Sequence, residues 1–209
     1  MRVKTDEKRQ AIIEAAIAVF GEEGYERANM DNIARRAGGS KATVYGYFPS
    51  KEELFAVAMK AAVESTVGQI EGFLDTEAKD LRRVLQRVAE TYLEFALSDQ
   101  ALAVTRTAIS QGTASGLGAA LYAQGPERGI QVLSEFFEEQ TKRGRLVESD
   151  PVTAALHFTG LIVAGQLEPM LFGAKPWRER GAAIVDAVDA FLRAYQAKRT
   201  ERKKTRTPA

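Results

Sequence analysis

The stretch Asn29–Lys51 reads NMDNIARRAGGSKATVYGYFPSK, and it decides the fold expected for the chain. Its pattern predicts a first helix that ends at the pair Gly38-Gly39, because glycine reaches positive φ without steric cost. A second, short helix over Lys41–Phe48 is expected to end before Pro49, which lacks an N–H and disfavours helical geometry in the preceding residue. Two short helices around a glycine turn match the helix-turn-helix unit, but they also match any small helical hairpin.

Side chains at the ends of these helices supply the expected caps. Asn29 or Asp31 can cap the first helix and Ser40 can cap the second, because a side-chain oxygen there accepts an N–H of the first turn. Ser50 is in position to cap a third helix, and Glu53 follows three residues later, where a capping box places its acid. The local pattern therefore predicts a helix start at each of these points.

The side chains of the second helix favour the helix-turn-helix over an ordinary hairpin. Val44 and Phe48 are apolar and four residues apart, so they can anchor the helix inward. The remaining faces carry Lys41, Ala42, Thr43, Tyr45 and Tyr47. A lysine, a threonine and two tyrosines on an exposed short helix suit a surface that contacts phosphates and bases better than they suit a core.

The segment from Arg9 to Phe55 resembles the DNA-binding domain of the TetR/AcrR family of bacterial transcriptional repressors. The matching residues include AAIAVFGEEGYERANMDNIARRAGGSKATVYGYFPSKEELF. The motifs that carry the resemblance are the Phe20-Gly21-x-x-Gly24-Tyr25 joint, the Ile33-Ala34 pair and the run from Ser40 to Leu54. The resemblance implies an all-α fold, in which a three-helix DNA-binding domain with a helix-turn-helix is joined by a long helix to a helical-bundle ligand-binding and dimerisation domain.

The resemblance also implies a function and a set of DNA contacts. A protein of this kind is a ligand-responsive repressor, which binds a palindromic double-stranded DNA operator as a homodimer and releases it when a small molecule binds. The implied contacts are, near base edges, Lys41, Ala42 and Tyr45, and, on the phosphate backbone, Asn29, Thr43, Tyr47 and Lys51.

Two glycines depart from the commonest family pattern. Gly39 replaces an apolar residue in the turn, and Gly46 replaces a larger side chain on the second helix. Gly46 costs about 1 kcal/mol of helix propensity relative to alanine. We hypothesise that this helix is loosely formed until it meets DNA.

The rest of the chain has helical periodicity, and no strand-like alternation or internal repeat is present. The expected helices are Thr5–Glu23, Ser50–Asp75, Asp80–Ser98, Gln100–Gln111, Ala119–Lys142, Pro151–Phe172 and Trp177–Lys198. Gly125-Pro126 is expected to interrupt the helix Ala119–Lys142, and Gly112–Gly118 is expected to be a flexible break. We therefore expect a DNA-binding domain over 1–55, with the helix-turn-helix at about 29–48. A regulatory and dimerisation domain over 56–198 and a basic, disordered tail over 199–209 would follow, and the tail could instead add phosphate attraction.

Composition and the length of the apolar runs limit which other classes of protein the chain could belong to. Hydrophobic residues make up 45% and charged residues 27% of the chain, as in an ordinary globular protein, and there is no cysteine. No apolar run approaches the roughly 20 residues that span a bilayer, and the first residues lack the apolar core of a signal peptide. A cytoplasmic protein without membrane contact is expected. The net charge of +1 does not by itself indicate nucleic-acid binding.

No catalytic or metal-binding pattern stands out. The single histidine, His157, lies in an apolar helical stretch, and one histidine without cysteine cannot form a typical zinc site. No nucleophile elbow, phosphate loop or pair of carboxylates is recognisable. We therefore expect neither an enzyme nor a bound metal or cofactor.

The resemblance places a pocket for an apolar or amphipathic effector among the middle helices. The aromatic or polar candidates for its lining are Tyr92, Phe95, Phe136, Phe137, His157, Gln166 and Trp177, each of which could equally be ordinary core. The last two helices are apolar enough to form a four-helix dimer interface, with Leu161, Gly165, Val188, Phe191 and Leu192 as its candidates, although a monomer core would have the same pattern. The alternative function is a helical carrier or enzyme whose amino-terminal unit mediates protein contacts.

Overall fold

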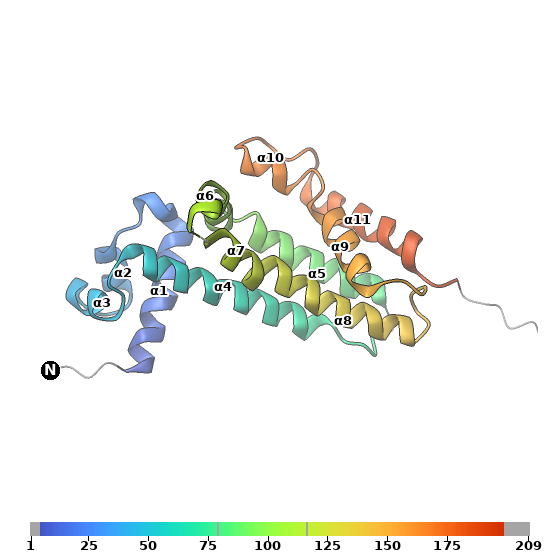
Figure 1. Ribbon diagram of the computed structural model, residues 1–209, viewed down its shortest axis with the longest axis horizontal. Helices are drawn as coiled ribbons and strands as arrows, with labels where there is room; N and C mark the ends of the chain where they lie inside the picture. Colours follow the sequence, from blue (N-terminus) through green and yellow to red (C-terminus); the bar gives the residue numbers. More distant parts are fainter. Residues whose placement is uncertain (1–4, 79, 116, 199–209) are drawn as a thin grey trace, which may run out of the picture.

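The computed structural model describes residues 5–78, 80–115 and 117–198, and these residues form an all-helical fold (Figure 1). The elements in chain order are α1 Asp6–Arg27, α2 Met30–Arg36, α3 Lys41–Tyr47, α4 Lys51–Phe73, α5 Leu81–Ala96, α6 Asp99–Ser115, α7 Leu117–Tyr122, the π-helical turn η1 Ala123–Glu127, α8 Arg128–Lys142, α9 Pro151–Val163, α10 Leu167–Leu171 and α11 Arg180–Tyr195. Within the described residues, strand-type pairing is limited to one bridge between Leu146 and Gln196.

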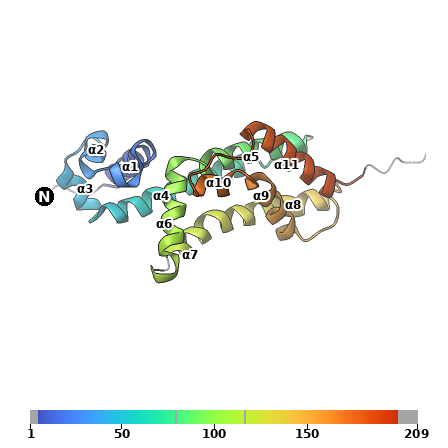
Figure 2. The ribbon, with the colours of Figure 1, turned by 90° about the horizontal axis from the view of Figure 1, so that it is seen from above.

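The first three helices pack with the start of α4 around a small core of their own, which we call the reading core. Its largest buried side chains are Phe20, Phe48, Ile12, Ile33 and Leu54. Thr5 caps α1 as expected, and Gly24 interrupts the helical geometry near its end with a φ of 75°. Figure 2 shows these helices gathered at one end of α4, with α5, α8, α9 and α11 at the other.

Helix α4 belongs to two cores. Leu54 and Ala58 are buried in the reading core, whereas Ile70, near the other end of the helix, is buried in a larger core. A helix of 23 residues is about 34 Å long. It therefore links the two ends of the molecule, as the sequence indicated (Figure 1).

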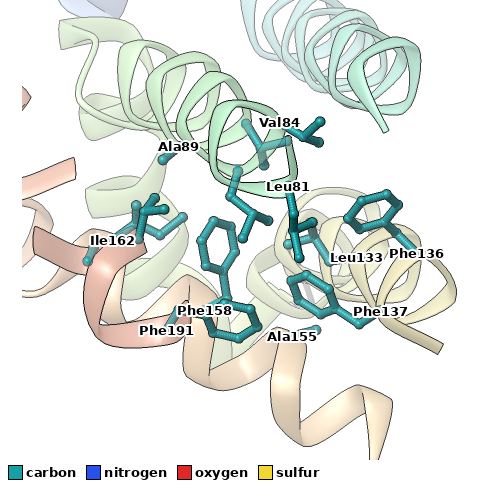
Figure 3. Packing of buried hydrophobic residues seen from close by; sticks show 14 of the residues in the cluster. Leu81, Val84, Ala89, Leu133, Phe136, Phe137, Ala155, Phe158, Ile162 and Phe191 are labelled. Carbon is teal, nitrogen blue, oxygen red and sulfur yellow. The ribbon is translucent and has the colours of Figure 1, made fainter. Parts of the chain in front are cut away.

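The larger core, which we call the regulatory core, lies between α5, α8, α9 and α11 and is rich in aromatic rings (Figure 3). The ring of Phe191 is central to it. Its centroid lies 4.9 Å from that of Phe137, 5.1 Å from that of Phe158 and 4.7 Å from that of Tyr195. Aromatic pairs at these distances add to the free energy gained by burying their area.

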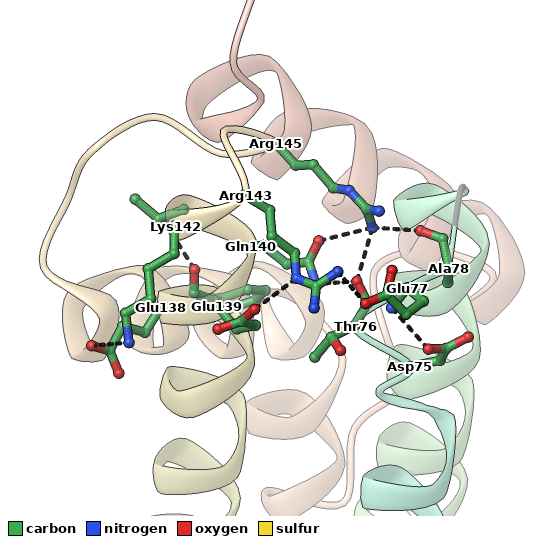
Figure 4. A network of polar contacts seen from close by, with 12 residues as sticks. Asp75, Thr76, Glu77, Ala78, Glu138, Glu139, Gln140, Lys142, Arg143 and Arg145 are labelled. Carbon is green, nitrogen blue, oxygen red and sulfur yellow. Dashed lines mark hydrogen bonds and ion pairs between the residues drawn. The ribbon is translucent and has the colours of Figure 1, made fainter.

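A polar network ties the α4–α5 connection to the end of α8 (Figure 4). Gln140 is fully buried, and its Nε2 donates to the carbonyl of Thr76 at 3.3 Å. Arg145 Nη1 donates to the carbonyls of Thr76 and Ala78 at 3.1 and 2.6 Å and to Oε1 of Gln140 at 3.2 Å. The buried amide therefore has partners for both of its ends, as a buried polar group requires.

The expected single helix Pro151–Phe172 is wrong, because it is broken into α9 and α10. Gly165 at the break has a φ of 69°, which an L side chain rarely adopts, and its carbonyl accepts the N–H of Trp177 at 3.0 Å. Arg106 of α6 then holds the end of α10, since its Nε and Nη2 donate to the carbonyls of Leu171 and Met170 at 2.8 and 2.6 Å. A continuous helix would have left these carbonyls without internal partners, because residue 169, four after Gly165, is a proline without an N–H and Met170 and Leu171 lie in the last turn. The long-range bonds therefore satisfy groups that the helix itself cannot.

Other boundaries also differ from the expectation. The predicted break over Gly112–Gly118 is too long, because α6 continues to Ser115. The interruption expected at Gly125-Pro126 is confirmed, and it takes the form of η1, where a proline without an N–H is accommodated in a wider turn. The last helix begins at Arg180, where Glu179 caps it, and not at Trp177. The expected basic tail over 199–209 lies outside the described residues.

Candidate nucleic-acid interface

The helix-turn-helix forms as its caps predicted. Oδ1 of Asn29 accepts the N–H of Asn32 at 2.9 Å, so Asn29, and not Asp31, caps α2. Gly38 takes a φ of 64° in the turn. Oγ of Ser40 then accepts the N–H of Thr43 at 3.1 Å and starts α3.

Helix α3 has one anchored face and one open face. Val44 is completely buried, and Phe48, which ends the helix, is 1% exposed. Lys41, Ala42 and Tyr45 are exposed, and Tyr45 keeps 43% of its accessible surface. Because Val44 and Phe48 fix how the helix is rotated about its axis, the exposed side chains have a defined direction.

Lys41 is paired across the turn with an acid. Its Nζ lies 2.7 Å from Oδ2 of Asp31, and both side chains are about half exposed. The hydrogen bond to Asp31 and the attraction between the charges raise the pKa of Lys41 above its ordinary value. A phosphate or base would therefore have to replace Asp31 as the partner of this ammonium group.

The four other residues expected at DNA lie on or next to the same helix, and each of them already has a partner within the protein. Oγ1 of Thr43 is 2.9 Å from Oγ of Ser40, and the Tyr47 hydroxyl accepts the backbone N–H of Thr5 at 2.8 Å. The Lys51 ammonium lies 4.4 Å from the centre of the Tyr25 ring. Asn29 uses its side chain as the cap of α2.

Acids of α1 balance the basic residues of α2. Arg36 Nη1 lies 2.7 Å from Oε2 of Glu22, and this hydrogen bond lowers the pKa of the Glu22 carboxyl. Asn32 donates to Glu23 at 2.6 Å, and Arg35 donates to Asn32 at 2.8 Å. The acids before the helix-turn-helix therefore orient its arginine-bearing face.

The start of α1 also contributes to this site, and no pattern in the sequence predicted that contribution. Lys8 donates to two carbonyls of the turn, and the Arg9 guanidinium lies 5.3 Å from the centre of the Phe48 ring. Residues so far apart along the chain have no periodic signal in common. The charge of Lys8 in the first turns of a helix packed on the turn was the one available hint.

The seven expected effector-binding residues lie in different surroundings, some in the core and some at the surface. Phe136 and Phe137 are buried in the regulatory core, and Tyr92 and Phe95 are partly buried, with burial raising the pKa of the Tyr92 phenol. His157 is exposed and its Nδ1 is hydrogen-bonded to the Tyr195 hydroxyl. Trp177 keeps 84% of its accessible surface. Their expected role as the lining of an effector pocket stays a prediction.

Gln166 is the expected effector residue with an unmet hydrogen-bonding group. It is 1% exposed, and its Nε2 donates to the carbonyl of Arg178 at 3.1 Å, but its Oε1 has no hydrogen-bond partner among the described residues. A hollow of about 390 Å³ lies elsewhere, between the start of α5, the α8–α9 connection and the end of α11. Its lining is Asp80, Leu81, Arg82, Gly144, Arg145, Leu192, Gln196 and Ala197, with none of the seven.

Three of the residues expected at the dimer interface are buried inside the protomer. Val188, Phe191 and Leu192 are buried in the regulatory core, so they do not present a surface to a second chain. Leu161 is 36% exposed, and Gly165 forms the break after α9. The exposed apolar side chains of α9 and α11 are instead Val152, Leu156, Leu161 and Val185.

Two family descriptions match this chain. Residues 12–58 match the bacterial regulatory proteins of the tetR family, and residues 83–197, more than half of the chain, match the carboxy-terminal domain of AefR-like transcriptional repressors. An amino-terminal helix-turn-helix followed by a helical domain defines a DNA-binding regulator. The chain belongs to the TetR family of transcriptional regulators, as its sequence predicted, and it is not an enzyme.

Individual relatives agree with this assignment. The transcriptional activator FasR of Mycolicibacterium smegmatis is 37% identical over 94 residues, which span 45% of this chain and 42% of FasR. A TetR-family regulator from Mesorhizobium loti MAFF303099 superimposes with a TM-score of 0.78 at 29% identity, over 93% of this chain and all of that one. The flavonoid-responsive regulator FrrA gives a TM-score of 0.60 at 33% identity, over 92% and 98% of the two chains.

The chain spans less than half the length of FasR, whereas it spans nearly all of the two solved structures. Within the described ranges, none of the helices has the length and apolarity needed to cross a membrane.

Proposed function

We propose that the chain is a ligand-responsive repressor that binds a palindromic operator as a homodimer and releases it when a small molecule binds. The observation that carries the proposal is the exposed face of α3, where Lys41, Ala42 and Tyr45 stand on a helix anchored by Val44 and Phe48. Repression is supported by the match to AefR-like repressors. Such a regulator works where bacterial DNA lies, in the cytoplasm.

The proposal divides the chain into a DNA-reading domain over 1–55 and a regulatory and dimerisation domain over 56–198. The separate reading and regulatory cores support this division. In the reading domain, Lys41, Ala42 and Tyr45 are proposed to contact base edges. The backbone contacts proposed for it are Asn29, Thr43, Tyr47 and Lys51.

The DNA contacts can be tested with a duplex that the full-length protein enriches from a random-sequence library. Lys41→Ala combined with Tyr45→Ala should weaken binding to this duplex by roughly tenfold or more per residue, because a base contact is worth about 1–3 kcal/mol. The matched control is Lys175→Ala combined with Tyr122→Ala, which removes an exposed lysine and an exposed tyrosine far from α3. Equal affinities of the two double variants would refute the proposed reading surface.

The homodimer is supported by exposed apolar side chains on α9 and α11. Leu156 keeps 51% and Val185 keeps 44% of its accessible surface, and such side chains gain free energy when a second chain covers them. Leu156→Arg combined with Leu161→Arg should give monomers in sedimentation experiments, and it should lower duplex affinity because two half-sites are no longer read together. Ile109→Arg, at an exposed position on α6, is the control that should leave the mass unchanged.

The ligand response is supported by FrrA, which is named as flavonoid-responsive, and by buried Gln166, whose Oε1 has no hydrogen-bond partner in the part of the chain that the structure describes. An apolar or amphipathic effector with a hydrogen-bond donor would suit such a group. A panel of flavonoids and fatty acids should contain a compound that lowers duplex affinity, and Gln166→Leu should reduce that response. A compound that binds without changing duplex affinity would argue against coupling. A reporter gene under the selected duplex would then distinguish repression from the activation that FasR is named for.

A further inference from the structure

Lys8 lies in the first turns of α1, yet its ammonium group lies on the turn of the helix-turn-helix. Its Nζ donates to the carbonyl of Ala37 at 2.6 Å and to that of Gly38 at 2.9 Å. The carbonyls at the end of a helix lack partners within it, and a cation there also compensates the negative end of the helix dipole. The Lys8 side chain therefore closes the end of α2.

Gly39 leaves the room that this contact needs. A Cβ at position 39 would lie 3.4 Å from both Cε and Nζ of Lys8 and 3.6 Å from Cβ of Thr43. Gly38 has a positive φ, but Gly39 does not, so the backbone does not require glycine at position 39. These distances are ordinary van der Waals contacts, so alanine would fit, whereas a β-branched side chain would crowd the Lys8 stem unless the stem moved. A small residue at position 39 is therefore compatible with the observed position of Lys8.

The same two turns of α1 also contact the far end of α3. The backbone N–H of Thr5 donates to the Tyr47 hydroxyl at 2.8 Å, and the Arg9 guanidinium lies over the Phe48 ring. Lys8 stands between these contacts and holds the turn that precedes α3. The start of α1 therefore contacts the helix-turn-helix, which we also call the reading unit, on both sides of α3, its recognition helix.

We propose that Lys8 and Gly39 act as a pair that positions the recognition helix. The Lys8 stem takes the place of a side chain in the turn, and its ammonium group fixes the end of α2, which sets the direction in which α3 leaves the turn. Lys8 is a positioning residue that acts through the backbone and does not itself contact DNA. The inference requires DNA binding by the helix-turn-helix, but it does not require a ligand response.

The first test compares Lys8→Met with the wild type on the library-selected duplex over a range of salt concentrations. The methionine keeps an unbranched side chain but loses the charge and both hydrogen bonds. Affinity should fall about tenfold, and the slope of log affinity against log salt should stay the same. A slope reduced by about 0.9 would mean that Lys8 contacts a phosphate, which would overturn the proposal. Lys60→Met, an exposed lysine on α4, controls for the loss of one charge.

The second test asks whether the two residues act together. Gly39→Val should weaken duplex binding about tenfold in the wild type, because the valine collides with Lys8. The same substitution should cost much less in a Lys8→Ala background, where the space is free. Equal costs in the two backgrounds would show that the pair is not coupled and would overturn the proposal.

A measurement without DNA separates positioning from simple loss of binding. The N–H groups of Gly38 and Gly39 donate to the carbonyls of Arg35 and Ala34 at 3.1 and 2.9 Å. In Lys8→Met, hydrogen exchange at these two amides should become about tenfold faster, while exchange in the regulatory core stays as in the wild type. Unchanged exchange at both amides would mean that Lys8 does not hold the turn.

Discussion

The reading core and the regulatory core are organised in different ways. In the reading core two short helices, α2 and α3, are held between the long helices α1 and α4. Asn29, Ser40 and Ser50 cap the starts of α2, α3 and α4. The regulatory core depends on rings from three helices, of which Phe137, Phe158 and Phe191 are mutual neighbours. Caps also start α5, α9 and α11, so the difference lies in helix length and in the packed rings: the smaller unit contains two seven-residue helices, and the larger one is centred on Phe191. Substitutions in the two cores should therefore change the free energy of unfolding by different amounts and have different consequences for DNA binding.

The largest expected effect is in the regulatory core. Phe191→Ala should lower the free energy of unfolding by about 3–5 kcal/mol, because it removes a fully buried ring and leaves a cavity between its aromatic neighbours. Urea unfolding followed by circular dichroism measures the change. Ile109→Ala, at an exposed position on α6 outside the proposed dimer interface, should change stability by less than about 0.5 kcal/mol. A loss of similar size in both variants would contradict the central place of Phe191.

A smaller effect is expected from a cap of the reading unit. Ser40→Ala removes the acceptor of the Thr43 N–H and should cost about 1 kcal/mol of stability. Without this cap the first turn of α3 should fray, so duplex affinity should fall even though the regulatory core is unchanged. Ser65→Ala, at an exposed position inside α4, is the control and should leave affinity intact. If affinity stayed at the wild-type level in Ser40→Ala, the cap would not govern the recognition helix.

Gly46 offers a substitution that should strengthen the reading unit. No atom lies within 4 Å of a Cβ built at this position, so Gly46→Ala should stabilise α3 by up to about 1 kcal/mol through helix propensity. Amide exchange over Val44–Phe48 should then slow in the free protein. Gly72→Ala, which is equally unhindered on α4, should leave exchange in α3 unchanged. Wild-type exchange already as slow as that of the core would rule out a loosely formed recognition helix.

The smallest expected effect concerns pH and the start of α11. Hydrogen bonds from the backbone N–H groups of Gly181 and Ala182 lower the pKa of Glu179 below its ordinary value of 4.5. A carboxyl whose pKa is lower in the folded state stabilises the fold above its unfolded pKa, and this stability is lost as pH falls through the folded pKa. The melting temperature of Glu179→Gln should therefore decline less with acidification than that of the wild type. Parallel declines would show that this cap does not contribute.

Much of the reading unit could be predicted because its signals are local. Ser40 and Ser50 lie at the helix starts that they cap, and the apolar pair Val44 and Phe48 lies on one face of one helix. The contact of Lys8 with the turn could not be predicted, because it joins residues about thirty positions apart in sequence. The angle between α1 and α2, which no local pattern encodes, brings these residues together.

In the regulatory half, the sequence predicted helices more reliably than their ends or their roles. The apolar run through Gly165 has continuous helical periodicity, yet tertiary bonds from Arg106 and Trp177 stabilise a break there. Phe136 was expected at a ligand and Phe191 at a partner chain, but both are buried within the protomer. A ring in a core, a pocket or an interface obeys the same periodicity, so only the three-dimensional packing separates these roles.

The middle of α4 has a practical consequence for protein engineering. Between Met59 and Ile70 no residue of this helix is fully buried, although Ala61 packs against the reading core. The second half of this stretch, beyond Ala61, is therefore a suitable junction for a chimera that exchanges the residues after it for those of another family member. The joined helix must keep its helical register, because one inserted residue would rotate the helix-turn-helix by roughly 100° about the axis of α4 and move it along that axis by about 1.5 Å. If the proposed homodimer reads two half-sites, insertions of successive lengths would change the geometry between them in steps of one residue.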